Sequence, residues 1–290
     1  LVDFYPAQMI EGLPGNPYSV IYSADGRYLY AGNDVGQVQV WAQQGNRLVA
    51  ATTYETRGAT FSLALSPDGR VLAAGGDNSK AKIGNVGLLD VNSGQWLDWL
   101  EVPTPTGVFD DIYAVAFSSD GYYLATGGDY DRAWRDYSSG MTDGIVRVWQ
   151  LATRGNTVLA SAVLTLTDPT ARVRGVAFDP RPLRNAARPI YEPYYLAGGS
   201  FDGAVYIWAL TPDAPGSVTA NLARTLRGHT AAVNSVAYSP AEDILASASA
   251  DKTIRIWNPH TGQELLTLTG HTSGVENIAF SADGRYLISG

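Results

Sequence analysis

The sequence predicts an all-β fold in which one four-stranded sheet recurs around a ring, the architecture of a β-propeller. Two observations predict it. One motif recurs along the chain at a period of about 40 to 50 residues, which marks propellers and related arrays. Within each copy, apolar and polar residues alternate as they do in β-strands, and helical periodicity is absent. A ring of radially packed sheets buries both faces of each sheet and leaves only short strand edges.

The recurring motif is an apolar run, a turn and a second apolar run. Complete copies are VIYSADGRYLYAG from Val20, LALSPDGRVLAAG from Leu63, VAFSSDGYYLATG from Val115, VAYSPAEDILASAS from Val236 and IAFSADGRYLISG from Ile278, and VAFDP from Val176 is an interrupted copy. Asp-Gly pairs lie between the two runs, at Asp25, Asp68, Asp120 and Asp283. A tight hairpin needs positive φ at this place. Each copy therefore predicts a β-meander.

A third strand ends each copy with a bulky apolar residue. This residue is Trp41, Leu89, Trp149, Trp208 or Trp257. The intervals into the third and fourth of these positions are longer than the others, which predicts loop insertions there. In the last of these strands Ile254 and Ile256 face one way and Trp257 faces the other, so both faces of the sheet can pack.

We expect residues 1–290 to form one propeller domain. Five complete blades are expected at about 13–56, 57–107, 108–168, 169–228 and 229–270. A sixth blade is expected to be split between the termini, with residues 1–12 supplying its outer strand and residues 271–290 its first two strands. Because this blade lacks a third strand, we expect the chain to be a fragment of a longer protein, which leaves room for flanking domains.

The sequence resembles the WD40 family across nearly its whole length. The resemblance rests on Gly228-His229 and Gly270-His271, on the SPDG-like turns and on the closing Trp. Seven blades are common in that family, so the resemblance implies a seven-bladed parent. It also implies a structural tetrad in the fifth blade, formed by His229, Ser247, Asp251 and Trp257. Other copies match the tetrad only in part: Asp168-Pro169 stands where the fourth copy would have Gly-His.

Composition excludes several classes of function. The net charge of −8, from 28 acidic and 20 basic residues, opposes binding to nucleic acid, which needs clustered Lys and Arg. The absence of cysteine rules out a disulfide framework and a thiol nucleophile. No apolar run reaches the roughly 18 residues of a membrane-spanning helix. We expect a soluble, cytoplasmic chain, and the lack of cysteine leaves an extracytoplasmic location open.

No residue pattern points to catalysis. Of the three histidines, His229 and His271 belong to the Gly-His step of the repeat, and His260 stands alone. A Ser, His and Asp set outside the repeat is missing, as is the spacing of a calcium-binding loop. The Gly-Gly pairs end second strands without a helix after them, so they do not form a phosphate loop. The sequence therefore predicts no catalytic residue, no metal ligand and no cofactor.

The resemblance places one variable residue of each blade at the mouth of the central channel, where the first strand opens. By alignment these residues are Tyr18, Phe61, Tyr113, Arg174, Asn234 and Glu276. Aromatic residues and Arg are favoured in interface hot spots because they bury a large area and still carry polar groups. The row predicts a groove for a protein or peptide partner. The alternative is that Phe61 and the tyrosines only plug the channel.

An insertion in the third copy, GGDYDRAWRDYSSGMTDG, is expected on the same face. Arg132 and Trp134 are its candidate partner-binding residues, since long ordered loops are usually functional. The alternative is that Trp134 folds the loop back onto its blade. The aspartates Asp129, Asp131 and Asp136 support a competing hypothesis, a metal-binding or hydrolytic propeller.

A second insertion, RPLRNAARPIYEP, lies in the fourth copy and is expected on the opposite face. Its Arg181, Arg184 and Arg188 could dock an acidic partner, although a solvated loop is the preferred explanation. The SADGRY and TGQELLTLTGH phrases are similar to repeats of prokaryotic multidomain signalling proteins. The sequence thus predicts a non-enzymatic scaffold that recruits a protein or peptide, with no nucleic acid and no membrane insertion. A purely structural spacer is the third hypothesis.

Overall fold

The computed structural model describes residues 10, 13–78, 83–101, 111–130, 143–154, 157–180, 193–214 and 217–290. All regular elements in these ranges are β-strands, arranged as five four-stranded sheets and one two-stranded sheet. The prediction of an all-β propeller with five complete blades is confirmed. These ranges contain no helix of the length and apolarity needed to cross a membrane.

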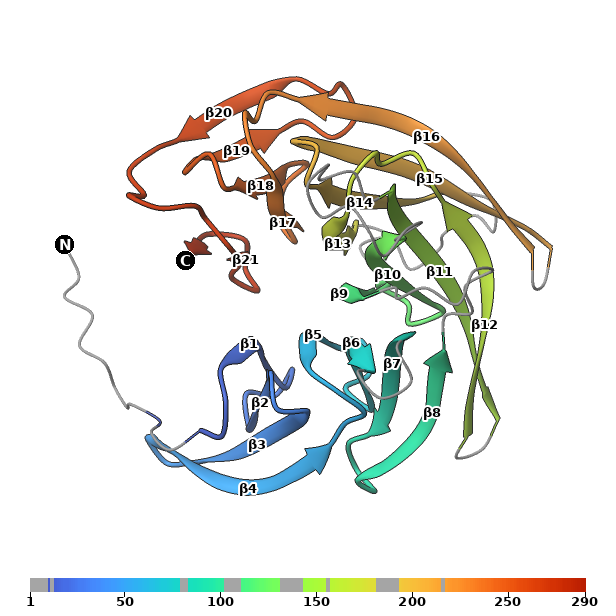
Figure 1. Cartoon of the computed structure of the whole chain (residues 1–290), viewed down its shortest axis with the longest axis vertical. Coiled ribbons are helices and arrows are strands. Elements are labelled where there is room, and N and C mark those ends of the chain that lie inside the picture. Colours follow the sequence, from blue (N-terminus) through green and yellow to red (C-terminus); the bar gives the residue numbers. More distant parts are fainter. Residues whose placement is uncertain are drawn as a thin grey trace, which may run out of the picture.

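Every complete blade is an antiparallel meander whose first strand is innermost (Figure 1). Blade 1 contains β1 (Pro17–Tyr22), β2 (Tyr28–Asn33), β3 (Gln37–Gln44) and β4 (Arg47–Glu55). Blade 2 contains β5 (Thr60–Leu65), β6 (Val71–Asn78), β7 (Ile83–Asp90) and β8 (Gln95–Glu101). Blade 3 contains β9 (Ile112–Phe117), β10 (Tyr123–Tyr130), β11 (Asp143–Arg154) and β12 (Thr157–Leu166).

The second half of the ring repeats this arrangement. Blade 4 contains β13 (Val173–Phe178), β14 (Tyr194–Ser200), β15 (Ala204–Ala214) and β16 (Ser217–Arg227). Blade 5 contains β17 (Val233–Tyr238), β18 (Leu245–Ser249), β19 (Ile254–Trp257) and β20 (Glu264–Leu268). A partial blade follows with β21 (Ile278–Phe280) and β22 (Leu287–Ser289).

The Asp-Gly hairpins form as the sequence predicts, with positive φ on the glycine. The φ angles are 69° at Gly26, 71° at Gly69, 75° at Gly121 and 72° at Gly284. In the first turn the Ser23 hydroxyl donates to Asp25 over 2.6 Å, and the Asp25 carboxylate accepts the Arg27 N–H over 3.0 Å. These bonds satisfy backbone groups of the turn from within the turn itself.

Blades pack face to face around the ring. Ile254 and Ile256 contact the partial blade through Val275 and Ile278, whereas Trp257 belongs to the core between blades 4 and 5. The predicted burial of both sheet faces is confirmed.

Glycine at the end of the second strand allows this close approach. A Cβ atom on Gly75 would lie 2.6 Å from Cγ1 of Val115 in the next blade, and one on Gly127 would lie 2.9 Å from Cγ1 of Val173. The first glycine of each of these pairs therefore serves blade packing.

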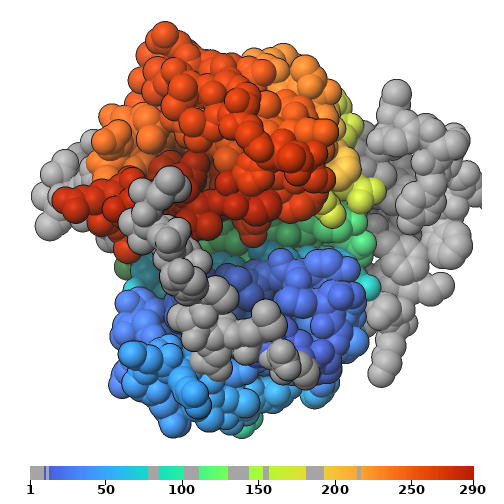
Figure 2. Space-filling model, turned by 90° about the vertical axis from the view of Figure 1, so that its left-hand side faces the viewer, coloured from blue at the N-terminus to red at the C-terminus, as the bar shows by residue number. Residues whose placement is uncertain are grey.

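The two ends of the ring face each other across an opening (Figure 1). Viewed from that side, the surface of blade 1 is separated from the surface of blade 5 and the partial blade, with the middle blades visible between them (Figure 2). Val20 and Tyr22 of β1 and Ile288 of β22 are exposed at these ends. The strand expected within residues 1–12 lies outside the described residues.

Candidate functional site

Five of the six residues expected at the channel mouth share one backbone feature, a β-bulge at the start of the innermost strand. In blade 1 the register passes from Pro17 paired with Asn33 to Ser19 paired with Gly32, which leaves Tyr18 without a partner in the ladder. The residues in the equivalent unpaired position of the other blades are Phe61, Tyr113, Arg174 and Asn234. A bulge bends the strand and redirects a side chain. The side chain at the bulge therefore need not point to either face of the sheet in the usual alternating order.

The bulges bring three aromatic rings from successive blades into one row. The centroids of Tyr18 and Phe61 are 5.3 Å apart with the planes at 70°, an edge-to-face contact. Phe61 and Tyr113 are stacked, with centroids 5.5 Å apart and planes at 22°. Aromatic pairs at these distances stabilise each other beyond the area they bury. The row is therefore a preformed surface that spans blades 1, 2 and 3.

Two guanidinium groups continue the row. Cζ of Arg174 lies 5.8 Å from the ring centroid of Tyr113 and 5.2 Å from that of Phe201. Cζ of Arg172 lies 5.4 Å and 5.1 Å from the same two centroids. Both cations are within cation–π range of both rings. Arg174 also forms an ion pair with Glu276, with 3.3 Å between Nη1 and Oε2.

Carboxylates surround the polar edge of Tyr113. Its hydroxyl donates to Asp111 Oδ2 over 3.1 Å and accepts from Arg172 Nη1 over 3.4 Å. Burial raises the pKa of Tyr113, and the nearby charges of Asp129 and Asp111 raise it further. Burial also raises the pKa of Asp111. Tyr113 thus remains a neutral phenol, suited to hydrogen bonding and not to proton transfer near neutral pH.

Five of the six residues expected at the mouth are linked in a chain of contacts, and Asn234 is not. Asn234 is buried, and its side-chain amide donates to the carbonyl of Val275 over 3.1 Å. Sequence reasoning missed Arg172, Asp111 and Phe201. Their signal is positional: Arg172 and Asp111 each stand two residues before a mouth position, and Phe201 follows the end of β14.

Several candidates fall outside the described residues. They are Arg132, Trp134, Asp131 and Asp136 of the blade 3 insertion and Arg181, Arg184 and Arg188 of the blade 4 insertion. Asp129, at the start of the blade 3 insertion, is described, and its Oδ2 lies 3.6 Å from Arg172 Nε. Within the described ranges no group of three or more His, Asp or Glu residues could hold a metal ion.

The tetrad residues of blade 5 form one hydrogen-bonded network. His229 lies with Nδ1 2.8 Å from Asp251 Oδ2 and Nε2 2.8 Å from Ser247 Oγ. Trp257 Nε1 donates to the same Ser247 hydroxyl over 2.8 Å. This network fits a neutral imidazole with its proton on Nδ1, since Nε2 then accepts from the serine.

The pKa values of the tetrad agree with its role as a structural network. Burial lowers the pKa of His229, against the opposing effect of Asp251. Burial alone would raise the pKa of Asp251, but hydrogen bonds from Thr253, His229 and Thr230 outweigh it and lower that pKa. Neighbours in the same blade bind both the neutral imidazole and the ionised carboxylate. These contacts stabilise the protonation states that the structural network requires.

Other blades rebuild this network with different residues. In blade 3 Trp149 Nε1 donates to Thr126 Oγ1 over 3.3 Å. In blade 4 Trp208 Nε1 donates to Asp168 Oδ2 over 2.7 Å. Asp168, which stands where the repeat would have the Gly of Gly-His, thus supplies the acceptor. In the partial blade His271 Nε2 lies 2.8 Å from Ser289 Oγ. The Trp–acceptor contact is thus retained in blades where the residue identities change.

Comparison with known proteins agrees with the repeat. The sequence profile described as WD domain, G-beta repeat matches residues 47–83, 103–150, 220–258 and 262–290, just over half of the chain. Coronin-7 of Mus musculus is 34% identical over 128 residues, which cover 44% of this chain and 13% of that protein. The Periodic tryptophan protein 2 homolog of Dictyostelium discoideum is 27% identical over 262 residues, covering 88% of this chain and 23% of that protein.

A third relative is the WD repeat-containing protein 26 homolog of Drosophila melanogaster. It is 26% identical over 251 residues, covering 83% of this chain and 38% of that protein. The chain therefore spans less than half the length of each of these relatives.

Proposed function

Because this chain belongs to the WD40 family, we propose that it is a non-enzymatic scaffold that recruits a protein or peptide partner at its channel mouth. The partner contacts the aromatic row of Tyr18, Phe61 and Tyr113 and the adjoining Arg174 and Glu276. The observation that carries the proposal is the contact chain across the blades: rings 5.3 Å and 5.5 Å apart, followed by guanidinium groups within 5.8 Å of a ring.

The physical argument is preorganisation. Side chains that are already packed against one another lose little conformational entropy when a partner binds. The rings offer apolar area, and Tyr18 is exposed at the end of the row. Interfaces concentrate their binding energy in such clusters of aromatic residues and Arg.

Charge at the rim defines how the partner is oriented. Arg174 and Glu276 each present one charge, and the ion pair between them is open to solvent. A carboxylate of the partner can bind Arg174, and a cationic group of the partner can bind Glu276. The apolar side chains of the partner then lie along the rings. An extended peptide with both charges near an apolar residue fits this arrangement.

The experiment uses peptides selected from a displayed random library against the wild-type chain. Their affinities are then measured by fluorescence polarisation for Phe61→Ala and Arg174→Ala. Each variant is expected to bind at least about tenfold more weakly, as expected for hot-spot truncation. Tyr286→Ala is the matched control, because Tyr286 is an exposed aromatic residue in the Asp-Gly turn of the partial blade.

Two results would overturn the proposal. One is unchanged affinity in both Phe61→Ala and Arg174→Ala. The other is loss of ligand binding when Asp129, Asp131 and Asp136 are replaced together by Asn while Tyr113→Ala and Arg174→Ala still bind. The second result would favour the metal-binding or hydrolytic hypothesis, and insensitivity to both sets would favour a structural spacer.

A further inference from the structure

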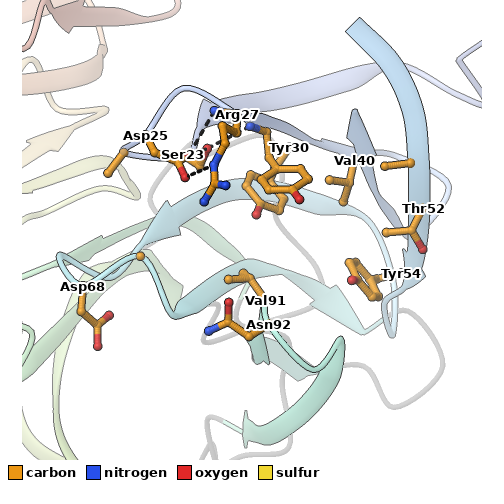
Figure 3. A pocket seen from close by; sticks show the side chains of 14 residues that line it. Ser23, Asp25, Arg27, Tyr30, Val40, Thr52, Tyr54, Asp68, Val91 and Asn92 are labelled. Carbon is orange, nitrogen blue, oxygen red and sulfur yellow. Dashed lines mark hydrogen bonds and ion pairs between the residues drawn. The ribbon is translucent and has the colours of Figure 1, made fainter. Parts of the chain in front are cut away.

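A groove lies between blades 1 and 2, with a volume of about 520 Å³ (Figure 3). It is separate from the channel mouth, because it is lined by the Asp-Gly turns at the other ends of the strands. One wall comes from blade 1, with Asp25, Arg27 and Tyr30, and the facing wall comes from blade 2, with Asp68 and Asn92. Tyr28 of blade 1 also lines it.

The equivalent junction between blades 3 and 4 is filled by aromatic rings. Tyr194 of blade 4 packs edge-to-face on Tyr123 of blade 3, with centroids 5.1 Å apart, and on Phe178, with centroids 6.5 Å apart. The Tyr194 hydroxyl donates to Oδ2 of Asp120 in the Asp-Gly turn of blade 3. Tyr123, Phe178 and Tyr194 are all buried there.

Strand register identifies the residues that replace these in blades 1 and 2. Leu65 pairs with Leu72 as Phe178 pairs with Leu196, so Leu65 stands in the place of Phe178. Counting back two residues from each paired leucine places Arg70 at the position of Tyr194.

The same register in the preceding blade relates Tyr28 to Tyr123. Leu29 pairs with Tyr22 as Leu124 pairs with Phe117, and Tyr28 and Tyr123 each precede the leucine. Asp25 of the first turn then corresponds to Asp120.

The substitutions remove the filling rings. Leu65 is smaller than a phenylalanine, and Arg70 turns to its own blade, where Nε lies 3.0 Å from Asp90 Oδ2. Tyr28 is therefore 39% exposed, whereas its equivalent Tyr123 is 5% exposed. The groove thus keeps the equivalents of Tyr123 and Asp120 in its lining, as Tyr28 and Asp25, whereas neither Leu65 nor Arg70 lines it.

The acceptor for a hydroxyl group is still in place. Asp25 accepts bonds from Ser23 and Arg27, which lower its pKa to about 2 and keep it ionised. Its side chain is 45% exposed, and a carboxylate can accept several hydrogen bonds at once. A phenol that entered the groove would therefore meet both the face of Tyr28 and a carboxylate.

We propose that the groove between blades 1 and 2 binds a tyrosine side chain of a partner, with the ring on Tyr28 and the hydroxyl donating to Asp25. The proposed ligand is the side chain that this protein itself places at the junction of blades 3 and 4. The groove is a second docking site for a partner, separate from the channel mouth.

The test uses N-acetyl-tyrosinamide and N-acetyl-phenylalaninamide as probes in NMR titrations of the whole chain. Tyrosinamide is expected to bind about tenfold more tightly, because only it donates a hydrogen bond to a charged acceptor. It should also shift the resonances of Tyr28 and Val91, which line the groove. Equal binding of the two probes, or no binding of tyrosinamide, overturns the proposal.

A filled groove provides the decisive variant. Leu65→Phe combined with Arg70→Tyr introduces the blade 4 residues into blade 2 and should abolish tyrosinamide binding. Arg285→Tyr is the matched control, since Arg285 holds the same repeat position in the partial blade and is exposed. Should the double variant fail to fold, Tyr28→Ala replaces it, with an expected loss of about fivefold or more. Undiminished binding of tyrosinamide in the folded filled-groove variant overturns the proposal. When Tyr28→Ala replaces that variant, undiminished binding in Tyr28→Ala overturns it.

Discussion

Arg174 and Glu276 form an ion pair between blade 4 and the start of the partial blade, although 102 positions separate them in the chain. Their side chains approach to 3.3 Å past blade 5, whose mouth residue Asn234 is buried and bonded elsewhere. The Arg174 guanidinium in this pair also lies beside the rings of Tyr113 and Phe201. This contact organises the candidate binding surface, and its exposure decides what it contributes to stability.

The first prediction concerns this ion pair. Glu276→Gln is expected to change the free energy of unfolding by less than about 1 kcal/mol, because Glu276 is 67% exposed and exposed ion pairs contribute little. Urea denaturation at low and high salt measures the effect. A decrease in the free energy of unfolding of more than about 2 kcal/mol would show that the ion pair stabilises the fold substantially.

A second prediction addresses the tetrad of blade 5. Ser247→Ala is expected to cost about 3 kcal/mol, because it leaves both His229 Nε2 and Trp257 Nε1 buried without a partner. Chemical denaturation measures the loss, and Ser217→Ala at an exposed position is the control. If the two variants were equally stable, the network would not support the fold.

Mild acid should destabilise the same blade. Burial lowers the pKa of His229 below its ordinary value of 6.5, so the unfolded chain takes up a proton before the folded chain does. The stabilisation is therefore complete above about pH 6.5 and declines as the pH falls toward the folded-state pKa. The Tm measured from pH 8 to pH 5 should fall more steeply in the wild type than in His229→Gln. Parallel profiles would contradict the assignment of a neutral imidazole.

Alkaline pH should act on blade 4. Burial and a hydrogen bond to Asp202 raise the pKa of Tyr206 from 10 to about 12. The folded chain keeps this proton longer, so the corresponding stability is present below pH 10 and is lost as the pH rises from about 10 to 12. Tyr206→Phe should show a shallower loss of stability in this range, measured by urea denaturation with circular dichroism. Identical slopes in the two proteins would exclude the Tyr206–Asp202 bond as the cause.

Much of the fold could be predicted because the information is local and periodic. The positions of Trp41, Trp149, Trp208 and Trp257 predict the third strands, and all four residues lie in them. Only β19 ends at its Trp, whereas β3, β11 and β15 continue for three, five and six residues beyond it. The Asp-Gly turns close through their own Ser and Asp side chains. Neither feature requires knowledge of a neighbouring blade.

The candidate site could be predicted only in part. Alignment of the repeats selected Tyr18, Phe61 and Tyr113, but the bulge that frees each residue from its ladder has no mark in a single strand. Arg172 and Phe201 escaped notice because their cation–π contact joins the residue before β13 to the residue after β14. Contact between them depends on side-chain direction, which spacing alone does not supply.

The sequence by itself determined the blade, since period, alternation and turn chemistry act within about 45 residues of chain. Tertiary structure alone decided what happens between blades. At one junction Phe178 and Tyr194 fill the space, and at another, where Leu65 and Arg70 hold the equivalent positions, a groove remains. The reason is physical: pairing within a blade follows the repeated backbone pattern, whereas packing between blades depends on the non-repeating side chains that meet there.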